Sequence, residues 1–600
     1  MREFSMPPLT DGAGAGAGTG NLTDDVVTNA GVAGSAVVFS RRHGDEWTGV
    51  TSAEFLSEVR AVAKGLVASG VATGDRVALV AKTRYEWTLL DYAIWFAGAV
   101  TVPIYETSSA DQIGWILSDS GACAVVAEQP VHVSRIAESR SDLPELRHVW
   151  SLEDNAVDVL SRLGADIADD ELESRRRAAT PLDLATIIYT SGTTGRPKGC
   201  MLTHGNFMTE VDTAVSELDA LFEADDAATL LFLPLAHVFA RVIQIGAVRA
   251  RVRLGHSADI KNLQASLAEF QPTFVLAVPR VFEKVFNTAS QRATAEGRGA
   301  IFNRAVDTAI AWSRGLEKGR VPLGVRLRHA AFSRLVYGRL REALGGRCEY
   351  AVSGGAPLGD RLGHFYRGIG LTVLEGYGLT ETTAALTVNR PDAIKIGTVG
   401  RPLPGTSVRV AEDGELLFEG GQVFAGYWND EAATREVLER DGWLHTGDVG
   451  EIDEEGFVRI TGRKKEILVT AGGKNVAPAV LEDRVRAHPL VSQCLVVGDG
   501  RPFIAALVTL DPDAVPDWAE RHGKSGTLAS LAADPDLRAE VESAMDEANR
   551  AVSKAESIRK FVVLPTEWSE EGGQLTPSLK LKRNVVLREA KDDIAALYLP

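Results

Sequence analysis

Short apolar runs alternate with amphipathic stretches through the first half of the chain. The runs at 76–80 and 100–103 are short and rich in valine, as expected of buried strands, whereas 54–68 and 86–97 have the apolar spacing of helices. Strands that alternate with helices in this way form parallel sheets covered by helices on their faces. The pattern therefore predicts an α/β fold with layered sheets.

Two glycine-rich segments directly follow predicted strands. Segment 189–199 follows the apolar run 184–188, and SGGAP at 353–357 follows the run 350–353. Further β-like runs are predicted at 123–127, 229–233 and 273–277. Ligands bind beyond the carboxyl ends of strands in open α/β sheets, so both segments are candidate binding loops.

Segment 295–346 is helix-prone and basic. Six arginines are interleaved with apolar side chains there: Arg320, Arg326, Arg328, Arg334, Arg339 and Arg341. This pattern suits a surface that faces a membrane or coenzyme A. The alternative is a solvated amphipathic helix pair that covers the core, and this is the more frequent case.

The texture of the chain changes twice more. Residues 1–22 are rich in Gly, Ala and Thr, and we expect a disordered tail. From residue 397 short strands punctuated by glycine, such as 407–410 and 415–419, predict a β-rich subdomain. A new α+β pattern begins after 463–465. We therefore expect a large domain over 23–463 and a small α+β domain over 464–600.

Composition limits the classes of function. The chain has 600 residues, too many for one core, and a formal charge of −17 that argues against general nucleic-acid binding. Its four cysteines are far apart and form no CxxC pair, which fits a reduced cytoplasm and indicates no metal site. The first residues contain no apolar signal core, and 89–105 is too interrupted to span a membrane.

The segment YTSGTTGRPKG at 189–199 has the composition of a phosphate-binding loop. Three glycines allow the backbone N–H groups to approach an anion, and Lys198 adds a positive charge. The further donors are Thr190, Ser191, Thr193 and Thr194. The spacing of Gly192, Gly195 and Lys198 differs from the P-loop of nucleotide triphosphatases, so this is a different loop. An ordinary flexible turn is the alternative.

Four more motifs follow in the order of one family. They are GYGLTETT at 376–383, TGD at 446–448, GRKKE at 462–466 and TPSLKLKR at 576–583. With the phosphate loop they resemble the adenylate-forming (AMP-binding) superfamily, over nearly the whole chain. The pairing of VTAGGKNVAP at 469–478 with LTPSLKLKR is most similar to its long-chain fatty acyl-CoA synthetase branch. That fold combines a large multi-subdomain α/β domain with a small mobile domain.

The resemblance implies roles for the large domain. Glu381 and Thr190 would be the Mg²⁺ ligands, which agrees with the preference of Mg²⁺ for one or two protein oxygens. Asp448 would bind the ribose hydroxyls, with Arg463 as a further donor. The adenine slot would be formed by Gly355, Ala356, Tyr377 and Gly378, with Thr380 nearby and Tyr377 stacked on the base. His237 would border the carboxylate pocket; a satisfied core histidine is the alternative.

The small domain would supply the mobile parts. Lys580 fits the adenylation lysine of the family, but Leu579 replaces a frequent glycine and leaves Lys582 as a competitor. Lys465 fits the hinge. After rotation the segment AGGKN, with Gly472 and Gly473, would replace Lys580 and leave space for pantetheine.

The sequence therefore predicts a ligase that uses ATP, Mg²⁺ and CoA to convert a fatty acid into its thioester through an acyl-AMP intermediate. Two alternatives remain: a fatty acyl-AMP ligase that loads a carrier protein, and a non-catalytic nucleotide-binding sensor. We expect small-molecule substrates, no nucleic acid and a cytoplasmic location, with peripheral contact to the inner face of the membrane as an option. The oligomeric state is left open.

Overall fold

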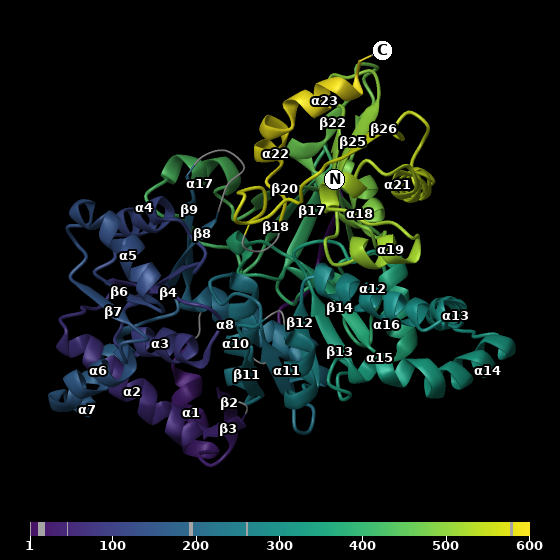
Figure 1. Cartoon of the computed structure of the whole chain (residues 1–600). Coiled ribbons are helices and arrows are strands. Elements are labelled where there is room, and N and C mark those ends of the chain that lie inside the picture. The colour runs from purple at the N-terminus through teal and green to yellow at the C-terminus, as the bar shows by residue number, and fades with distance from the viewer. Residues whose placement is uncertain are drawn as a thin grey trace.

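The structure, a computed structural model, describes residues 2–9, 19–44, 46–190, 196–259, 262–576 and 580–599. Three sheets build the large domain, and two smaller sheets lie in a small domain at the C-terminal end (Figure 1). Apolar side chains cover both faces of the first two sheets, so both sheets lie inside helical layers. The predicted α/β architecture is confirmed. Within these ranges, no helix is long and apolar enough to cross a membrane.

The first sheet has seven strands and carries the phosphate loop. Its order is β19-β9-β8-β5-β4-β6-β7, parallel from β8 to β7 and antiparallel at β9 and β19. The strands are β4 Arg76–Val80, β5 Val100–Ile104, β6 Ala124–Ala127, β7 His148–Ser151, β8 Leu184–Thr190, β9 Lys198–Thr203 and β19 Gly426–Tyr427.

The second sheet has nine strands in the order β16-β15-β14-β13-β12-β10-β11-β2-β3. Its bounds are β2 Val37–His43, β3 Glu46–Thr51, β10 Ala228–Leu231, β11 Arg253–His256, β12 Phe274–Ala277, β13 Tyr350–Ser353, β14 Thr372–Tyr377, β15 Thr387–Val388 and β16 Arg401–Pro402. The segments SGGAP and GYGLTETT leave the neighbouring strands β13 and β14 on the same side, because these strands are parallel.

Helices separate the two sheets and cover their outer faces. One apolar cluster joins inward side chains of both sheets to α2 Ser52–Ala68, α3 Tyr85–Phe96, α8 His204–Glu217 and α10 Val238–Ala250. The outer face of the second sheet packs against α11 Leu263–Phe270, α12 Pro279–Ala295, α13 Gly299–Glu317 and α16 Asp360–Ile369. The outer face of the first sheet packs against α4 Ala110–Ser120 and α5 Pro130–Glu138. The remaining helices of the large domain are α1 Asp24–Val32, α6 Ala156–Leu163, α7 Asp169–Ala178, α9 Asp219–Phe222, α14 Leu323–Phe332, α15 Gly338–Glu342 and α17 Glu431–Val437.

The third sheet is the predicted β-rich subdomain. Its order is β1-β17-β18-β20-β21, and all four pairings are antiparallel. The strands are β1 Arg2–Ser5, β17 Ser407–Val410, β18 Glu415–Glu419, β20 Leu444–Ile452 and β21 Val458–Arg463. Segments far apart in sequence therefore meet in one sheet that carries both TGD and GRKKE.

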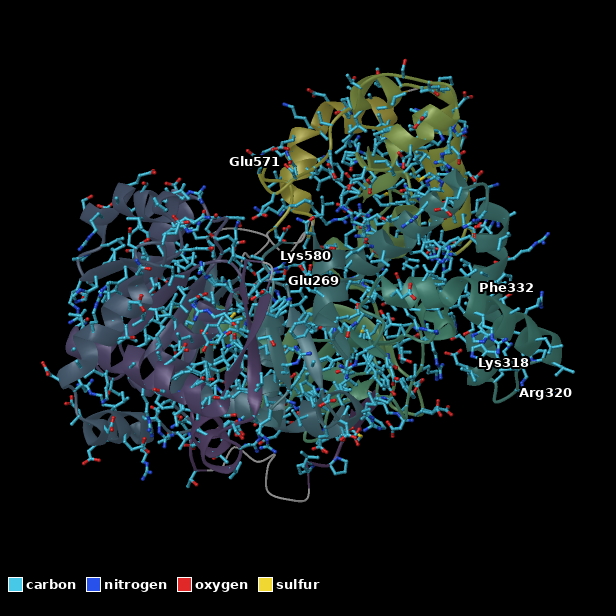
Figure 2. The ribbon with its side chains drawn as sticks, turned by 60° about the horizontal axis from the view of Figure 1, so that its bottom comes forward. Glu269, Lys318, Arg320, Phe332, Glu571 and Lys580 are labelled. Atoms are coloured by element: carbon cyan, nitrogen blue, oxygen red, sulfur yellow. The ribbon has the colours of Figure 1, made fainter. Side chains whose placement is uncertain are left out.

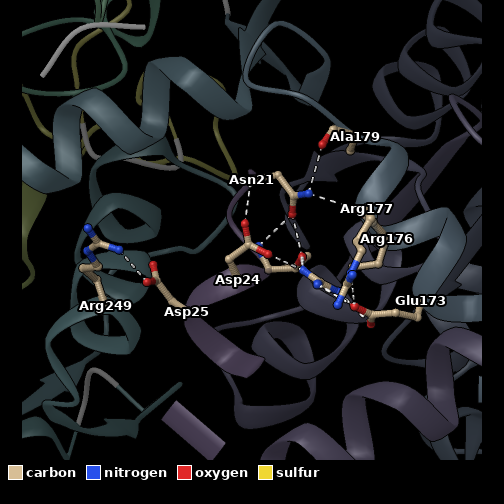
Figure 3. A network of polar contacts seen from close by, with 9 residues as sticks. Asn21, Asp24, Asp25, Glu173, Arg176, Arg177, Ala179 and Arg249 are labelled. Carbon is tan, nitrogen blue, oxygen red and sulfur yellow. Dashed lines mark hydrogen bonds and ion pairs between the residues drawn. The ribbon is translucent and has the colours of Figure 1, made fainter. Parts of the chain in front are cut away.

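The expected disordered tail over 1–22 is wrong for the parts described. Residues 2–5 form β1, because their backbone groups extend the third sheet beside β17. At the other end of the tail, the Asn21 side chain donates to the carbonyls of Arg176 and Ala179, and Arg176 pairs with Asp24 (Figure 3). Burial of Leu22 fixes this end as well. Residues 10–18 lie outside the described ranges.

The small domain has its own core around a three-stranded sheet and a two-stranded hairpin. Its strands are β22 Leu468–Val469, β23 Asn475–Val476, β24 Val491–Val497, β25 Ile504–Leu510 and β26 Ile558–Val563. Its helices are α18 Pro478–Arg486, α19 Val515–Arg521, α20 Leu528–Leu531, α21 Pro535–Asn549, α22 Arg583–Glu589 and α23 Lys591–Leu597. This domain lies above the large domain in Figure 1.

Candidate active site

The stems of the phosphate loop are strands β8 and β9. Thr190 is paired with Lys198 across this hairpin, so the threonine hydroxyl and the lysine stand at the two ends of the loop. The Lys198 ammonium lies over the Tyr427 ring, 5.1 Å from its centroid, and 3.9 Å from Asp430. The predicted residues Ser191, Gly192, Thr193, Thr194 and Gly195 lie outside the described ranges.

Helix α4 braces both stems of the loop. Asp119 accepts a hydrogen bond from the Tyr189 hydroxyl at 2.6 Å, and its backbone carbonyl accepts the Trp428 indole N–H at 3.0 Å. On the other stem, the Trp115 indole donates to the Pro197 carbonyl at 3.1 Å. The ends of the loop are thereby fixed by one helix.

Glu381 lies in a short 3₁₀ turn, Thr380–Thr382, that follows β14. The Tyr427 hydroxyl donates to Glu381 Oε1 at 2.8 Å. Tyr427 is also paired with Cys200 in β9, whose sulfur lies 3.9 Å from the Thr190 hydroxyl. The two predicted magnesium ligands, Thr190 and Glu381, are thus held on either side of one tyrosine–cysteine pair.

The predicted ribose site is a hydrogen-bonded group in the third sheet. Asp448 accepts the Tyr377 hydroxyl at 2.6 Å and forms an ion pair with Arg463 Nε at 3.1 Å. Asp448 and Arg463 are cross-strand partners in β20 and β21, so the strand register sets this contact. Burial and the Asp448 carboxylate raise the pKa of Tyr377, which keeps the phenol protonated as a donor.

Two glycines of the predicted adenine slot have steric reasons to be glycine. A Cβ atom at Gly378 would stand 1.4 Å from the Ala384 carbonyl oxygen, so the turn after β14 excludes every other residue. Gly355 has φ +83° and is exposed together with Ala356. The exposed backbone at Gly355 and Ala356 can therefore be approached closely by a flat ligand.

Lys580 belongs to the small domain and lies where this domain borders the large domain in Figure 2. A Cβ atom at Gly355 would lie 3.8 Å from Lys580 Cε and 3.9 Å from its Nζ. Partial desolvation and the Arg463 guanidinium lower the pKa of Lys580, and the carboxylates of Asp448 and Glu381 oppose this effect. The competing Lys582 is instead the residue before α22.

His237 precedes helix α10 and faces the same region. Its Nδ1 atom accepts the Phe239 backbone N–H at 3.2 Å. Burial and the positive charge of Lys580 lower the pKa of His237 to about 4, so the ring is neutral near pH 7. A neutral ring whose Nδ1 accepts a hydrogen bond carries its proton on Nε2.

The remaining predicted residues of the small domain lie apart from Lys580. Lys465 is exposed in a 3₁₀ turn, Lys464–Glu466, directly after β21. Gly472 and Gly473 are exposed in the turn between β22 and β23, and Gly473 has φ +74° with nothing near its Cβ position. Lys474 of this turn pairs with Glu556 of the same domain at 3.4 Å.

Three residues that contact the site were not predicted from the sequence: Tyr427, Asp119 and Trp428. All three contact predicted site residues or their immediate neighbours across more than 40 positions of sequence. The segment FAGYWND at 424–430 did carry a sequence signal, since two aromatic residues directly follow a glycine. In the structure Gly426 has φ +128°. Its relevance depends on the pairing of β19 with β9, which no local pattern reveals.

Two family models match the chain. The model described as AMP-binding enzyme matches residues 28–428, and the model described as AMP-binding enzyme C-terminal domain matches residues 465–599. The chain belongs to the AMP-binding enzyme family. Among its relatives, the long-chain-fatty-acid–CoA ligase FadD15 of Mycobacterium bovis is 52% identical over 604 residues, which cover both chains completely. The long-chain-fatty-acid–CoA ligase ACSBG2 of Xenopus laevis is 31% identical and covers 94% of this chain and 82% of its own.

Solved structures of the family have the same fold. The adenylation domain of the carboxylic acid reductase from Segniliparus rugosus, in complex with AMP and a carboxylic acid, aligns with a TM-score of 0.75 at 21% identity, over 96% of this chain and 94% of its own. The O-succinylbenzoate coenzyme A synthetase of Bacillus subtilis, in complex with ATP and magnesium, aligns with a TM-score of 0.67 at 20% identity, over 93% and 98%. These likenesses place the chain in the long-chain-fatty-acid–CoA ligase branch by sequence and in the adenylate-forming fold by structure.

Proposed function

We propose that this protein is an ATP-dependent long-chain fatty acid–CoA ligase. In the first step the fatty acid carboxylate attacks the α-phosphorus of ATP, forms acyl-AMP and releases pyrophosphate. In the second step the CoA sulfur attacks the acyl carbon and AMP leaves. The observation that carries the proposal is the position of Lys580 beside Gly355, where the charges of Asp448 and Glu381 act on it, in a chain that resembles FadD15 over its full length.

We assign nucleotide binding to residues of the large domain. Asp448 accepts hydrogen bonds from the ribose hydroxyls, and Arg463 lies beside it as a donor. Gly355, Ala356, Gly378 and Thr380 line the slot for adenine. The Tyr377 ring packs along the base while its hydroxyl orients Asp448. The loop from Thr190 to Lys198 binds the β- and γ-phosphates.

Magnesium fits the oxygen ligands of this site. Thr190 offers a hydroxyl and Glu381 a carboxylate whose Oε1 atom is oriented by Tyr427. A Mg²⁺ ion takes few protein oxygens and completes its shell with water and phosphate. When bound, the ion supplies charge neutralisation on the phosphates.

Lys580 supplies the charge at the reacting atoms. The barrier of the first step arises from the approach of an anionic carboxylate to anionic phosphates, so a preorganised cation lowers it. Lys580 lies beside Gly355, and its positive charge also acts on His237. The neutral His237 ring offers Nε2–H as a donor at the mouth of the carboxylate pocket, where a positive ring would compete with Lys580.

The two steps require the small domain to turn. Lys580 faces the cleft, whereas Gly472 and Gly473 lie in a hairpin that packs within the small domain. We propose Lys465, exposed in the turn after β21, as the pivot that exchanges them. Substitution of Lys465→Pro fixes φ near −65°. We expect adenylation to survive and thioester formation from supplied acyl-AMP to fall; equal loss of both steps in a folded variant would contradict the assignment.

One pair of assays tests the function. With ATP, Mg²⁺ and a fatty acid but no CoA, the enzyme should exchange labelled pyrophosphate into ATP; with CoA, mass spectrometry should detect thioesters over a panel from acetate to long-chain acids. Exchange without any CoA thioester would favour an acyl-AMP ligase that loads a carrier protein. Nucleotide binding without exchange would favour a sensor.

The same proposal includes peripheral contact with a membrane. Long-chain fatty acids partition into bilayers, so an enzyme that consumes them gains from proximity to a lipid surface. Vesicle binding by the full chain tests this contact.

A further inference from the structure

A basic helical arm projects from the large domain at the end opposite strands β8 and β9 (Figure 1). It consists of α14 Leu323–Phe332, a π-helical turn Ser333–Tyr337 and α15 Gly338–Glu342. Lys318, Arg320 and Phe332 mark its position at the outer edge of the molecule in Figure 2. The arm is distant from the candidate active site.

The inner face of the arm is firmly attached. His329 stacks on Trp312 with ring centroids 4.0 Å apart, and its Nε2 atom lies 2.7 Å from the Gly368 carbonyl. Val325 is buried, and the fully buried Tyr337 donates to the Ala305 carbonyl. The direction of the outer face is therefore fixed by packing.

The outer face carries large apolar side chains. Leu323, Leu327 and Leu335 are 70%, 67% and 69% exposed. Leu323 and Leu327 are one helical turn apart and therefore adjacent on the surface. Leucines exposed to this degree in a row on a rigid helix have no packing role in the described chain, which indicates an external partner.

The same region carries positive charge that forms no ion pairs within the described part of the chain. Between 318 and 347 the sequence has eight Lys or Arg residues and one acidic residue, in a protein with a net charge of −17. Within the described ranges no ion pair involves the six cations Lys318, Arg320, Arg326, Arg328, Arg334 and Arg339, whereas arginines elsewhere, such as Arg249 and Arg390, pair with carboxylates. Arg326 and Arg334 lie beside the leucines on the outer face.

We propose that this outer face, defined by Leu323, Leu327, Leu335, Arg326 and Arg334, docks on an anionic lipid bilayer. Leucines enter the boundary between headgroups and acyl chains, and arginines pair with lipid phosphates while their stems stay apolar. A nucleic acid would use the arginines but leave the leucines in water. The location of the arm is independent of the proposed function, and only the biological benefit of docking rests on it.

The test is sedimentation of the full-length protein with vesicles, in the absence of ATP, CoA and fatty acid. Binding to phosphatidylcholine–phosphatidylglycerol vesicles should exceed binding to pure phosphatidylcholine and should weaken with salt. The double variant Leu323→Ser and Leu327→Ser should bind at least ~10-fold more weakly. The double variant Arg326→Gln and Arg334→Gln should lose the preference for anionic vesicles.

Matched controls lie on other faces. Leu182 is 82% exposed, and the side chain of Arg435 is 71% exposed; the variants Leu182→Ser and Arg435→Gln should bind vesicles like the parent. Pyrophosphate exchange with a short, water-soluble acid should be unchanged in all variants, which separates docking from catalysis. The proposal is overturned if the parent ignores anionic vesicles, if the controls weaken binding as much as the arm variants, or if the arm binds RNA and not vesicles.

Discussion

The large-domain side and the small-domain side of the candidate active site are built differently. On the large domain both carboxylates of the proposed nucleotide site have partners: Asp448 has Tyr377 and Arg463, and Glu381 has Tyr427. On the small domain the Lys580 ammonium lies beside Gly355, 3.9 Å from where a Cβ atom would stand, and the charges of Arg463, Asp448 and Glu381 act on it from the other domain. The large-domain side is preorganised, whereas we propose that motion of the small domain brings Lys580 to it. Such a division suits an enzyme that keeps its nucleotide in place while it changes the group that acts on it.

The contact between the domains supports the same contrast. Helix α12 of the large domain holds the small domain through the ion pairs Arg280–Asp511 and Lys284–Asp513, both at 2.9 Å. Polar, partly solvated contacts of this kind can separate without exposing an apolar core. We therefore expect that this contact can open when the small domain turns, and three substitutions test the difference between the two sides of the site.

The largest effect is expected from the substitution of Lys580. Lys580→Ala removes the cation beside Gly355 and should lower the rate of acyl-AMP formation by at least ~10²-fold, the scale for one preorganised charge-stabilising donor. Supplied acyl-AMP should still be converted to thioester, because the second step uses the other pose. Pyrophosphate exchange and single-turnover thioester formation measure the two steps.

Lys582→Ala is the matched control for this substitution. It changes the same residue type two positions later, at the start of α22, and should leave pyrophosphate exchange near the parental rate. If Lys582→Ala has the large defect and Lys580→Ala does not, the assignment of the adenylation lysine is wrong by two residues.

A smaller effect is expected on the preorganised large-domain side. Tyr427→Phe removes the donor to Glu381 but keeps the ring beneath the Lys198 ammonium. A hydrogen bond to a charged group is worth about 1.5–3 kcal/mol, so we expect adenylation to fall by about ten-fold or more at limiting Mg²⁺. The defect should shrink at high Mg²⁺, because the ion then compensates for the poorer orientation of Glu381.

Tyr366→Phe is the control for this prediction. Tyr366 is buried and donates to the Phe282 carbonyl, outside the cleft, so its loss tests a purely structural hydrogen bond. It should reduce thermal stability and leave the Mg²⁺ dependence of adenylation unchanged. A defect of Tyr427→Phe that is equal at all Mg²⁺ concentrations would mean that Tyr427 acts only through the fold.

The sequence predicted the buried strands well and the short strands with distant partners poorly. Apolar runs located the buried strands within one or two residues, and β4 and β13 agree in full, because burial on both faces leaves an unbroken run of apolar side chains. Strands β1 and β19 escaped prediction. They have four and two residues, and they exist only because a distant strand offers backbone partners.

The same limit applied to the site. Motif order predicted Asp448 and Arg463 as site residues, and the structure shows that they are cross-strand partners in β20 and β21. Tyr427 was missed because its partners lie 46 positions away at Glu381 and across the β19–β9 pairing. Spacing alone could not choose between Lys580 and Lys582, since both lie in one short segment; only the fold places Lys580 against Gly355.

The smallest effect is expected at the ion pair between helix α12 and the small domain. Asp511→Asn weakens the half-buried pair with Arg280 and keeps the side-chain oxygen that accepts the N–H groups of Asp513 and Ala514. Such pairs contribute up to about 1 kcal/mol, so the adenylation pose should lose population and pyrophosphate exchange should slow by at most ~5-fold. Thioester formation from acyl-AMP should not slow.

Asp513→Asn is the control, because its partner Lys284 is as exposed as Asp513 itself, and it should change neither step. Equal slowing of both steps by Asp511→Asn, or an equal effect of the two substitutions, would contradict a small domain held in the adenylation pose by this contact.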